Sequence, residues 1–338
     1  MVTIGDVAKA AGVSRSTVSY ALSGKRKISD EVREKIEEVI RSLNFTPNAG
    51  ARALATSQTH VIGLLARFLN DEFAPAMLQY ILGVTDRARE LGYDTLMVTE
   101  EDGLGALTRI SRSRMVDGFV LLNVAENDTR LDTLRAAPQP GALVGLPSDT
   151  DGLDVFDLDF EAAGQLMVDR LFELGHREMI LVSQPEHVVA RGGAYVWRLA
   201  NAARNRAADR GAVVHTYFGA SQQPAIGEDL NRMLDTHPGA TGLLVNNEAA
   251  AAALPSVLQH RGLRAPDDIS VIGRFSDDFA RTFSLPFSAV DSAAAELGRR
   301  AVEQLVLHIE TNVTEHIVEL IPPAIVDRGS IAEPRRRP

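Results

Sequence analysis

The chain has 338 residues and a formal net charge of −10, and it contains no cysteine. This length accommodates two or three domains with full cores, and the absence of cysteine excludes disulfides and thiolate metal sites and is typical of the reducing cytosol. No apolar run approaches the ~18 residues of a membrane-spanning helix, and the N-terminus has the pattern of an amphipathic helix rather than a signal peptide, so a cytoplasmic protein is expected.

The first predicted elements are two short helices joined by a tight turn. Residues 4–11 carry apolar side chains at i, i+3, i+4 and i+7, which form one face of a helix. Thr3 followed by Asp6 is typical of a capping box at the start of that helix. Gly12 breaks the pattern, and Ser14 is placed to cap a second helix. This arrangement predicts a helix-turn-helix.

The second helix has one apolar and one polar side. At about 100° per residue, its polar side comprises Arg15, Ser16, Ser19 and Tyr20. A polar helical face is usually only solvated, but here the polar face, the turn and the local charge agree. We expect Arg15 and Ser16 to read base edges, because they lie near the N-terminal end of the helix. Arginine reads guanine most often, so a G·C pair is expected in the site.

A third helix and a marginal fourth complete the head. Ser29 is placed to cap the third helix, and the three helices close one small core over residues 1–46. Residues 47–59, which include A-G-A-R-A-L-A-T, form a predicted hinge helix and linker. Isolated helices this short are marginal in water, so folding on a partner is expected. The one large apolar side chain there, Leu54, either packs against a neighbour or forms a wedge at a minor-groove base step.

The charge distribution favours a nucleic-acid partner. Residues 1–60 hold nine basic and six acidic side chains, a formal charge of +3, whereas the remainder carries −13. Phosphate neutralisation supplies most non-specific DNA affinity, and an acidic body is repelled from the duplex, which orients docking. The basic run of Lys25, Arg26 and Lys27 is expected to contact the DNA backbone, with a solvated loop as the alternative.

From residue 60 onward, short apolar runs alternate with amphipathic helices. Strands are predicted at 61–65, 95–99, 118–123, 142–146, 179–183, 213–217, 242–246, 270–273, 316–321 and 324–328, and long helices at 74–91, 160–174, 191–210 and 293–309. Such alternation predicts an α/β fold with parallel sheets covered by helices on both faces. So many strands indicate two sheets and therefore two subdomains with a cleft between them. Ligands in open α/β folds bind outside the carboxyl ends of the strands.

The predicted organisation of the body divides one continuous chain between two subdomains. The effector-binding and dimerisation domain spans residues 60–331. The N-subdomain takes about 60–159 and 290–318, and the C-subdomain takes about 160–289 and 319–331. Residues 332–338 are predicted to form a disordered tail.

The head resembles that of the lactose-repressor (LacI/GalR) family through D-V-A-K-A-A-G-V-S-R-S-T-V-S-Y-A-L-S-G, V-R-E-K-I, L-N-F-T-P-N and A-R-A-L-A. The resemblance implies a homodimer with two heads that read a palindromic operator through the major groove. By motif position it places Thr17, Ser19 and Asn48 at phosphates, Arg15 and Ser16 at bases and Leu54 at the hinge wedge. Tyr20 stands where the family often has arginine, which removes one expected contact. The full predicted DNA-binding set is Thr3, Arg15, Ser16, Thr17, Ser19, Tyr20, Lys25, Lys27, Asn48, Arg52, Ala53 and Leu54.

The body shares V-I-G-L-L, A-R-E-L-G-Y-D, V-D-G-F-V-L-L, L-G-H-R, L-L-V-N-N-E and D-D-I-S-V-I-G with the same family. The resemblance implies a periplasmic-binding-protein-like sensor of doubly wound sheets, with a small molecule, usually a sugar, between the subdomains. It places Arg198 and Asn247 in the pocket, and both side chains suit a polyhydroxylated ligand. Without the resemblance, Arg198 reads as a solvated helix residue.

Two departures from the family fall in the same pocket. Phe275 stands where the family has a sugar-gripping aspartate, so either its ring stacks on a sugar or the ligand is not a simple sugar. Near the first strand, Phe73 keeps its family position while the neighbouring proline and asparagine do not. The full predicted effector-binding set is Asn70, Phe73, Arg198, Asn247, Phe275 and Asp277.

Catalytic patterns are missing from the sequence. It contains no H-E-x-x-H, no G-x-x-x-x-G-K-[ST] and no G-x-S-x-G, and His176 is expected to be a structural histidine. We therefore predict that the protein is not an enzyme and has no cofactor and no metal site. The expected partners are double-stranded DNA, a second copy of the chain and a small-molecule effector, which the resemblance implies is a sugar; no membrane partner is expected.

Two hypotheses follow: a ligand-responsive transcriptional repressor, or a soluble sugar-binding protein without a DNA role. The sequence leaves open the operator, the effector, the sign of its effect and whether the assembly is a dimer or a tetramer.

Overall fold

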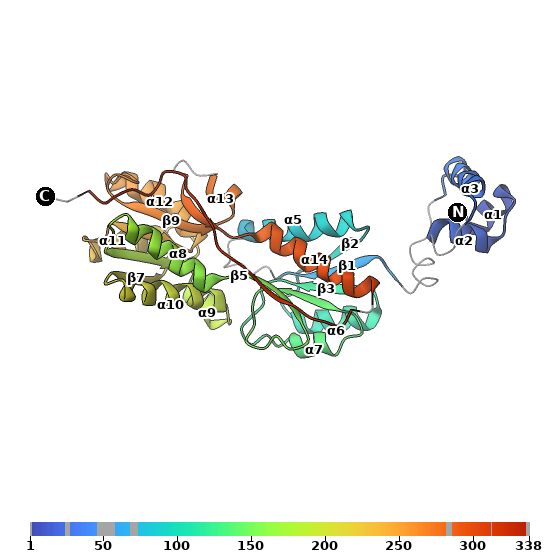
Figure 1. The fold of residues 1–338 in the computed structure, drawn as a ribbon, viewed down its shortest axis with the longest axis horizontal. Helices are drawn as coiled ribbons and strands as arrows, with labels where there is room; N and C mark the ends of the chain where they lie inside the picture. The colour runs from blue at the N-terminus through green and yellow to red at the C-terminus, as the bar shows by residue number, and fades with distance from the viewer. Residues whose placement is uncertain are drawn as a thin grey trace. The chain divides into compact units, whose positions relative to one another are not determined.

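The computed structural model describes residues 2–23, 28–45, 58–67, 74–281, 286–311 and 313–335. It divides into two compact units, Met1–Thr59 and His60–Pro338 (Figure 1). Within the described part, no helix is both long and apolar enough to span a bilayer. Several predicted site residues lie outside the described ranges, namely Lys25, Lys27, Asn48, Arg52, Ala53, Leu54, Asn70 and Phe73.

The first unit contains helices α1 (Ile4–Ala11), α2 (Arg15–Ser23) and α3 (Asp30–Ser42). The predicted capping box is confirmed: Thr3 N donates to Asp6 Oδ2 over 2.8 Å, and Asp6 N donates to Thr3 Oγ1 over 3.3 Å. Gly12 ends α1 in the left-handed region at φ +67°, a conformation that glycine adopts without strain.

The start of α2 is also as predicted, because Thr17 N donates to Ser14 Oγ over 3.0 Å. The prediction for α3 needs a correction. Ser29 stands at its N-cap position, but its side chain makes no capping hydrogen bond. The apolar faces of the three helices meet in one core, in which Val7, Val18 and Ile36 are completely buried.

The second unit contains two six-stranded sheets, which confirms the predicted fold class. Sheet A has the order β11-β5-β4-β3-β1-β2 and sheet B the order β12-β10-β9-β8-β6-β7. All neighbouring strands are parallel except β12, which runs antiparallel to β10. Sheet A comprises β1 (Val61–Leu65), β2 (Asp94–Val98), β3 (Gly118–Leu121), β4 (Gly141–Val144), β5 (Asp154–Leu158) and β11 (Val318–Ile321). Sheet B comprises β6 (Glu178–Ser183), β7 (Val213–Phe218), β8 (Gly242–Val245), β9 (Ser270–Phe275), β10 (Ser288–Asp291) and β12 (Ile325–Val326).

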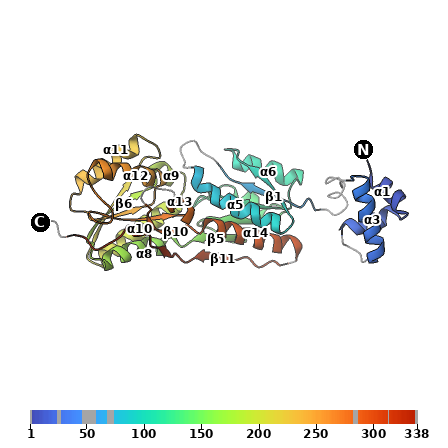
Figure 2. The ribbon, with the colours of Figure 1, turned by 90° about the horizontal axis from the view of Figure 1, so that it is seen from above.

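Helices cover both faces of each sheet, and the hydrophobic clusters show which helix covers which face (Figure 2). On sheet A, α5 (Ala74–Glu90) and α14 (Ala294–Glu310) lie on one face, and α6 (Gly103–Ser113) and α7 (Leu131–Arg135) lie on the other. On sheet B, α8 (Phe160–Glu173) and α10 (Ala194–Asp209) cover one face, and α11 (Ala225–Thr236), α12 (Glu248–His260) and α13 (Asp277–Arg281) cover the other. The short α9 (Glu186–Ala190) precedes α10.

Helices α5 and α14 approach each other backbone to backbone. A Cβ atom on Gly83 would collide with the carbonyl oxygen of Ala295, and one on Gly298 would lie 2.7 Å from the carbonyl oxygen of Tyr80. Glycine at these two positions therefore allows the closest packing between the helices of sheet A.

The chain passes between the two sheets three times: after β5, after β10, and between Ile321 and Ile325. The third passage corrects the boundary predicted near residue 318, because β11 pairs with β5 and so remains in sheet A through Ile321. We call sheet A with its helices the N-subdomain, and sheet B with its helices the C-subdomain.

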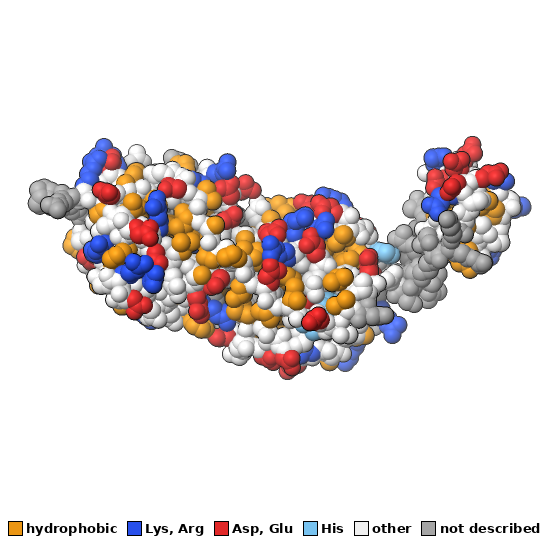
Figure 3. All heavy atoms as spheres, in the orientation of Figure 1, with side chains coloured by type: hydrophobic (Ala, Val, Ile, Leu, Met, Phe, Trp, Pro, Cys, Tyr) orange, Lys and Arg blue, Asp and Glu red, His pale blue; other side chains and the backbone are white. Residues whose placement is uncertain are grey.

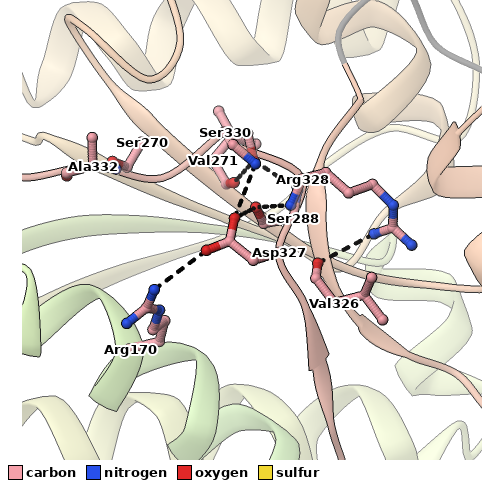
Figure 4. Close-up of polar contacts among 10 residues, drawn as sticks. Arg170, Ser270, Val271, Ser288, Val326, Asp327, Arg328, Ser330 and Ala332 are labelled. Carbon is pink, nitrogen blue, oxygen red and sulfur yellow. Dashed lines mark hydrogen bonds and ion pairs between the residues drawn. The ribbon is translucent and has the colours of Figure 1, made fainter.

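The segment after β12 is held to the C-subdomain by side chains of sheet B (Figure 4). Ser288 Oγ donates to Asp327 Oδ1 over 2.9 Å, and Arg328 N donates to Ser288 Oγ over 2.9 Å. Ser330 Oγ donates to the carbonyl of Val271 over 2.6 Å. These hydrogen bonds fix the terminal segment to strands β9 and β10 of sheet B.

The prediction of a disordered tail at 332–338 is wrong for its first residues. Ala332 N donates to Ser270 Oγ over 3.0 Å, and His176 Nε2 donates to the Ala332 carbonyl over 2.9 Å. His176 is buried, and that burial lowers its pKa below the ordinary value. The prediction of a structural histidine is therefore confirmed.

Candidate functional site

Helix α2 presents a polar face. Arg15 and Ser16 are exposed at its first turn, whereas Thr17, Ser19 and Tyr20 are half-buried. Thr17 Oγ1 lies 2.8 Å from Ser14 Oγ, so its hydroxyl is held within the first turn.

Two members of the predicted set are tied to α1. The guanidinium of Arg15 lies against Gly5, where an added Cβ would be 2.7 Å from its NH2 atom. The Thr3 hydroxyl donates to Asp6 Oδ2 over 2.7 Å. Ser16 and Arg15 are both exposed, and the guanidinium of Arg15 lies beside the first turn of α1.

A cavity of about 200 Å³ lies between the two subdomains of the second unit. Its walls come from the carboxyl ends of strands in both sheets, as is usual for open α/β folds. The N-subdomain contributes Arg67, Met77, Tyr80, Leu122, Asn123, Val124, Ala125, Val144, Gly145, Leu146 and Asp157, and the C-subdomain contributes Phe160, Gln184, Val188, Arg191, Gly193, Ala194, Tyr195, Ser221, Asn247, Glu248, Ala249 and Arg274.

Arg274, near the end of β9, is fixed in the cavity wall by two acceptors. Its Nε donates to Asn246 Oδ1 over 2.8 Å, and its NH2 donates to Glu248 Oε1 over 3.3 Å. The side chains of Arg274 and Glu248 are each only 8 % exposed, so they form a buried ion pair. Gln184 Nε2 donates to the other oxygen of Glu248 over 2.6 Å. These bonds hold the guanidinium in one orientation before any ligand arrives.

Asp157, on the opposite wall, is 7 % exposed. Burial raises the pKa of its carboxyl group to about 7, although hydrogen bonds from Leu146 N and Leu158 N and the charges of Arg198 and Arg274 lower it. The cavity therefore contains an acid that changes charge near neutral pH. Burial also raises the pKa of Tyr80 to about 12, so its hydroxyl keeps its proton.

A second buried ion pair supports the loop after β3. Arg130 NH2 lies 2.6 Å from Asp128 Oδ2, and both side chains are buried. The same nitrogen donates to the carbonyls of Leu122 and Asn123, each over 3.2 Å. Two backbone groups of the cavity wall are thus held by charge-assisted hydrogen bonds.

Of the predicted effector residues, Asn247 lines the cavity, but its side chain serves the framework. It caps α12 by accepting from Ala250 N over 2.9 Å. Its amide nitrogen donates to the carbonyls of Ser183 and Gly219 over 3.1 and 3.2 Å. The amide therefore shapes the wall, and a ligand would meet it with its polar atoms already engaged.

Three other predicted residues lie elsewhere. Phe275 is buried in the core of the C-subdomain and packs against Phe279, with ring centroids 5.2 Å apart. Residues along a strand alternate between its two faces, and because Arg274 faces the cavity, Phe275 faces the core. Asp277 forms an ion pair with Arg281 over 2.7 Å. Arg198 is not among the residues that line the cavity, but its NH1 donates to the carbonyl of Leu146 in the wall over 2.9 Å, which joins α10 to the N-subdomain.

The sequence interpretation missed Arg274, Glu248 and Asp157. The available signal was a charged residue near the carboxyl end of an otherwise apolar run, as in S-V-I-G-R-F. A charge in such a strand is costly unless it is paired, and that cost indicates a site.

Comparison with known proteins gives two family matches. Residues 3–48 match "Bacterial regulatory proteins, lacI family", and residues 168–331 match "Periplasmic binding protein-like domain". The transcriptional regulator MalR of Staphylococcus xylosus is 27% identical over 336 residues, with 98% of each chain covered. The ribose operon repressor of Haemophilus influenzae is 28% identical over 335 residues, with 98% of this chain and 99% of the repressor covered. Among solved structures, the lac repressor dimer bound to operator and the anti-inducer ONPF superposes with a TM-score of 0.80 at 23% identity, over 98% of this chain and 99% of that one, which shows the same fold.

Proposed function

Because the chain belongs to the LacI family of bacterial transcriptional regulators, we propose that it represses transcription as a homodimer on a palindromic operator, under the control of a sugar bound in the cavity of the second unit. One observation carries this proposal: the same chain contains both a DNA-binding type of motif and a cavity. The first unit has a capped helix-turn-helix with an exposed polar face, and the second unit has a cavity lined by both of its subdomains. We also propose that the protein acts in the cytoplasm, because its proposed target is DNA.

In this proposal, Arg15 and Ser16 read base edges, and Thr17 and Ser19 contact phosphates. The exposure of Arg15 and Ser16 supports their part. The basic and hinge residues complete the interface by resemblance: Thr3, Tyr20, Lys25, Lys27, Asn48, Arg52, Ala53 and Leu54.

The proposed second copy is supported by exposed apolar side chains on the N-subdomain. Leu78 and Leu82 on α5, Leu307 on α14, and Val318 and Leu320 on β11 are each more than a third exposed. Figure 3 shows hydrophobic side chains among the charged ones on the visible face of this unit. Apolar surface of this kind is typical of a protein–protein interface.

A sugar fits the chemistry of the cavity. The rings of Tyr80 and Phe160 offer flat apolar surface, and Arg274, Gln184 and Asp157 offer donors and acceptors in fixed positions. The name of the ribose operon repressor is consistent with this class of ligand.

Control by the effector follows from the position of the cavity. A ligand that touches both walls binds more tightly when the subdomains approach each other, and it therefore shifts the protein toward that arrangement. We propose that this shift is transmitted through the hinge segment 47–59 and changes the spacing of the two heads.

The decisive experiment compares Arg15→Ala with Arg112→Ala, an exposed arginine of α6 in the second unit. On an operator selected from a random duplex library, Arg15→Ala should lose about 1–3 kcal/mol of discrimination at one base pair in each half-site. The Arg112→Ala variant should bind like the wild type.

Two further results would contradict the proposal. A soluble sugar-binding protein without a DNA role would show no steep loss of duplex affinity between ~50 and ~200 mM salt. Sedimentation that showed a monomer on a site without two-fold symmetry would exclude the homodimer.

A further inference from the structure

Three side chains from three separate elements meet at the start of β5. They are Asp154, the first residue of that strand, His308 near the end of α14, and His316 in the segment before β11. His308 Nε2 lies 2.9 Å and His316 Nδ1 lies 3.1 Å from Asp154 Oδ2. The three ligand atoms all lie within 4.8 Å of one another. They therefore lie close enough together to share one ion.

This cluster is separate from the effector cavity. Asp157, which lines the cavity, is near the carboxyl end of β5, whereas Asp154 is at its amino end. The side chains of Asp154 and His308 are 1 % and 6 % exposed, and that of His316 is 35 % exposed. The cluster is thus largely buried but has a path to solvent.

The surroundings fix the orientation of each donor. Ile317 N donates to Asp154 Oδ1 over 3.0 Å, which leaves Oδ2 toward the histidines. His308 Nδ1 lies 2.9 Å from the carbonyl of Val313, and because a carbonyl only accepts, Nδ1 carries the hydrogen. A hydrogen bond from the second ring nitrogen to a backbone carbonyl is the usual support of a metal-binding histidine.

With its hydrogen on Nδ1, neutral His308 directs the lone pair of Nε2 at Asp154 Oδ2. Two electron-rich atoms 2.9 Å apart repel each other unless a cation lies between them. Gln304 Nε2 also lies 3.3 Å from the same ring nitrogen and would turn aside when an ion binds there. The arrangement therefore suits a metal ion shared by the three side chains.

We propose that Asp154, His308 and His316 bind a first-row divalent metal ion, with Zn²⁺ as the best fit and water as the remaining ligand. Neutral imidazole and carboxylate are common zinc ligands, whereas Mg²⁺ and Ca²⁺ take mainly oxygen. Zinc bonds of about 2.0–2.1 Å place tetrahedral ligands about 3.3 Å apart. The observed separations of 2.9 and 3.1 Å need to widen by only a few tenths of an ångström.

The ion would cross-link three segments that are distant in the sequence. It would join the first residue of β5 to the end of α14 and to the chain that enters β11. Because β11 leads into the last passage between the subdomains, the ion would anchor that passage on its N-subdomain side.

A second histidine cluster in the described part of the chain serves as a control. Glu178, His215 and His237 also have ligand atoms within 4.8 Å of one another. However, His237 Nδ1 is 3.8 Å from Glu178 Oε1, and its Nε2 lies 2.7 Å from Tyr217 OH. The rings of His215 and His237 stack face to face, with centroids 3.6 Å apart. The rings of His308 and His316 are also stacked, but their centroids are 5.0 Å apart, so the tighter stacking distinguishes the second cluster from the first.

The test uses the full chain, stripped of metal with a chelator and then titrated with Co²⁺, whose visible absorption reports nitrogen and oxygen ligation. We expect one Co²⁺ per chain, displaced by one equivalent of Zn²⁺, and a higher melting temperature with either ion. His316→Gln should weaken binding by at least ~10-fold, and its circular dichroism should match the wild type because His316 is partly exposed before an edge strand.

His215→Gln should bind the metal like the wild type, and so should Arg274→Gln, which alters only the effector cavity. The proposal is overturned if the wild type binds no Co²⁺. It is equally overturned if His316→Gln binds like the wild type, or if His215→Gln abolishes binding instead.

Discussion

Asp154 and Asp157 lie near opposite ends of the same strand, and each carboxylate is buried in a different polar environment. Asp154 faces two histidines at the amino end of β5, and Asp157 faces the cavity with Arg198 and Arg274 near enough to lower its pKa. The odd spacing of the two residues places them on opposite faces of the strand. One short element thus supplies an acid to the cavity and another to the proposed metal site, and the two can be tested separately.

The raised pKa of Asp157 predicts a pH dependence of stability. The pKa of its carboxyl group is about 7 in the folded state and 3.8 ordinarily. Between these two pH values the folded state therefore keeps a proton that the unfolded state has lost. The stabilisation is complete below about pH 4 and is lost as the pH rises toward 7. The melting temperature of the wild type should therefore fall over this range more steeply than that of Asp157→Asn, measured by calorimetry.

The Asp157→Asn variant starts from a lower stability, because asparagine cannot accept from both Leu146 N and Leu158 N. Only the difference in slope tests the prediction. Parallel curves for the two proteins would contradict it.

Because Arg274 and Glu248 form a buried ion pair, removing only one of the two charges should lower the unfolding free energy strongly. Arg274→Ala leaves a buried carboxylate with Gln184 as its remaining side-chain partner, which should cost about 3 kcal/mol of unfolding free energy. The double variant Arg274→Met with Glu248→Gln removes both charges and should recover more than half of that loss. Urea unfolding measures both, and an equal loss in the two proteins would show that the charge is not the cause.

The Arg274→Ala variant and the double variant Arg274→Met with Glu248→Gln should also lose effector binding. A thermal-shift screen of mono- and oligosaccharides, run on the wild type and on Arg274→Ala, checks this expectation. A sugar that stabilised the two proteins equally would bind somewhere other than this cavity.

The close approach of α5 and α14 predicts that Gly83→Ala is destabilising. The new Cβ would meet the carbonyl oxygen of Ala295, a backbone atom that moves only if the helix moves, so we expect a loss of about 1–3 kcal/mol. Gly227→Ala in α11 is the matched control, because its Cβ would meet only the flexible end of Gln223 at 3.1 Å. That variant should be neutral or more stable, since alanine favours a helix.

The capping box predicts a graded effect at Thr3. Thr3→Ala removes the acceptor for Asp6 N and should cost the head about 0.5–2 kcal/mol. Thr3→Ser keeps the hydroxyl and should retain most of the stability. Hydrogen exchange of the α1 amides distinguishes the two, and equal protection in both variants would mean that the cap contributes little.

The elements that could be predicted from the sequence are those with unbroken apolar patterns. The run Val61–Leu65 is a strand with the predicted bounds, because it carries no charge and ends at a clear boundary. Strand β5 was missed because Asp154 and Asp157 interrupt its pattern, and β10 because it is short and includes Ser288 and Asp291. In both strands the polar side chains are satisfied by tertiary contacts that no local pattern reveals.

The cavity shows the same limit for individual residues. Its position at the carboxyl ends of the strands follows from the fold class, which the sequence indicates well. The alternation along β9 decides whether residue 274 or 275 faces the ligand, and a shift of one residue exchanges the two. Position in a motif therefore pointed to Phe275, whereas the structure places Arg274 in the wall.

The last passage of the chain has a consequence for how the protein is made. Strand β11 completes one edge of sheet A, and β12 completes one edge of sheet B, so each sheet needs a strand that lies beyond residue 317 in the chain. The second unit can therefore complete its two sheets only after β11 and β12 have been synthesised, whereas the first unit, which ends at Thr59, can fold earlier in translation.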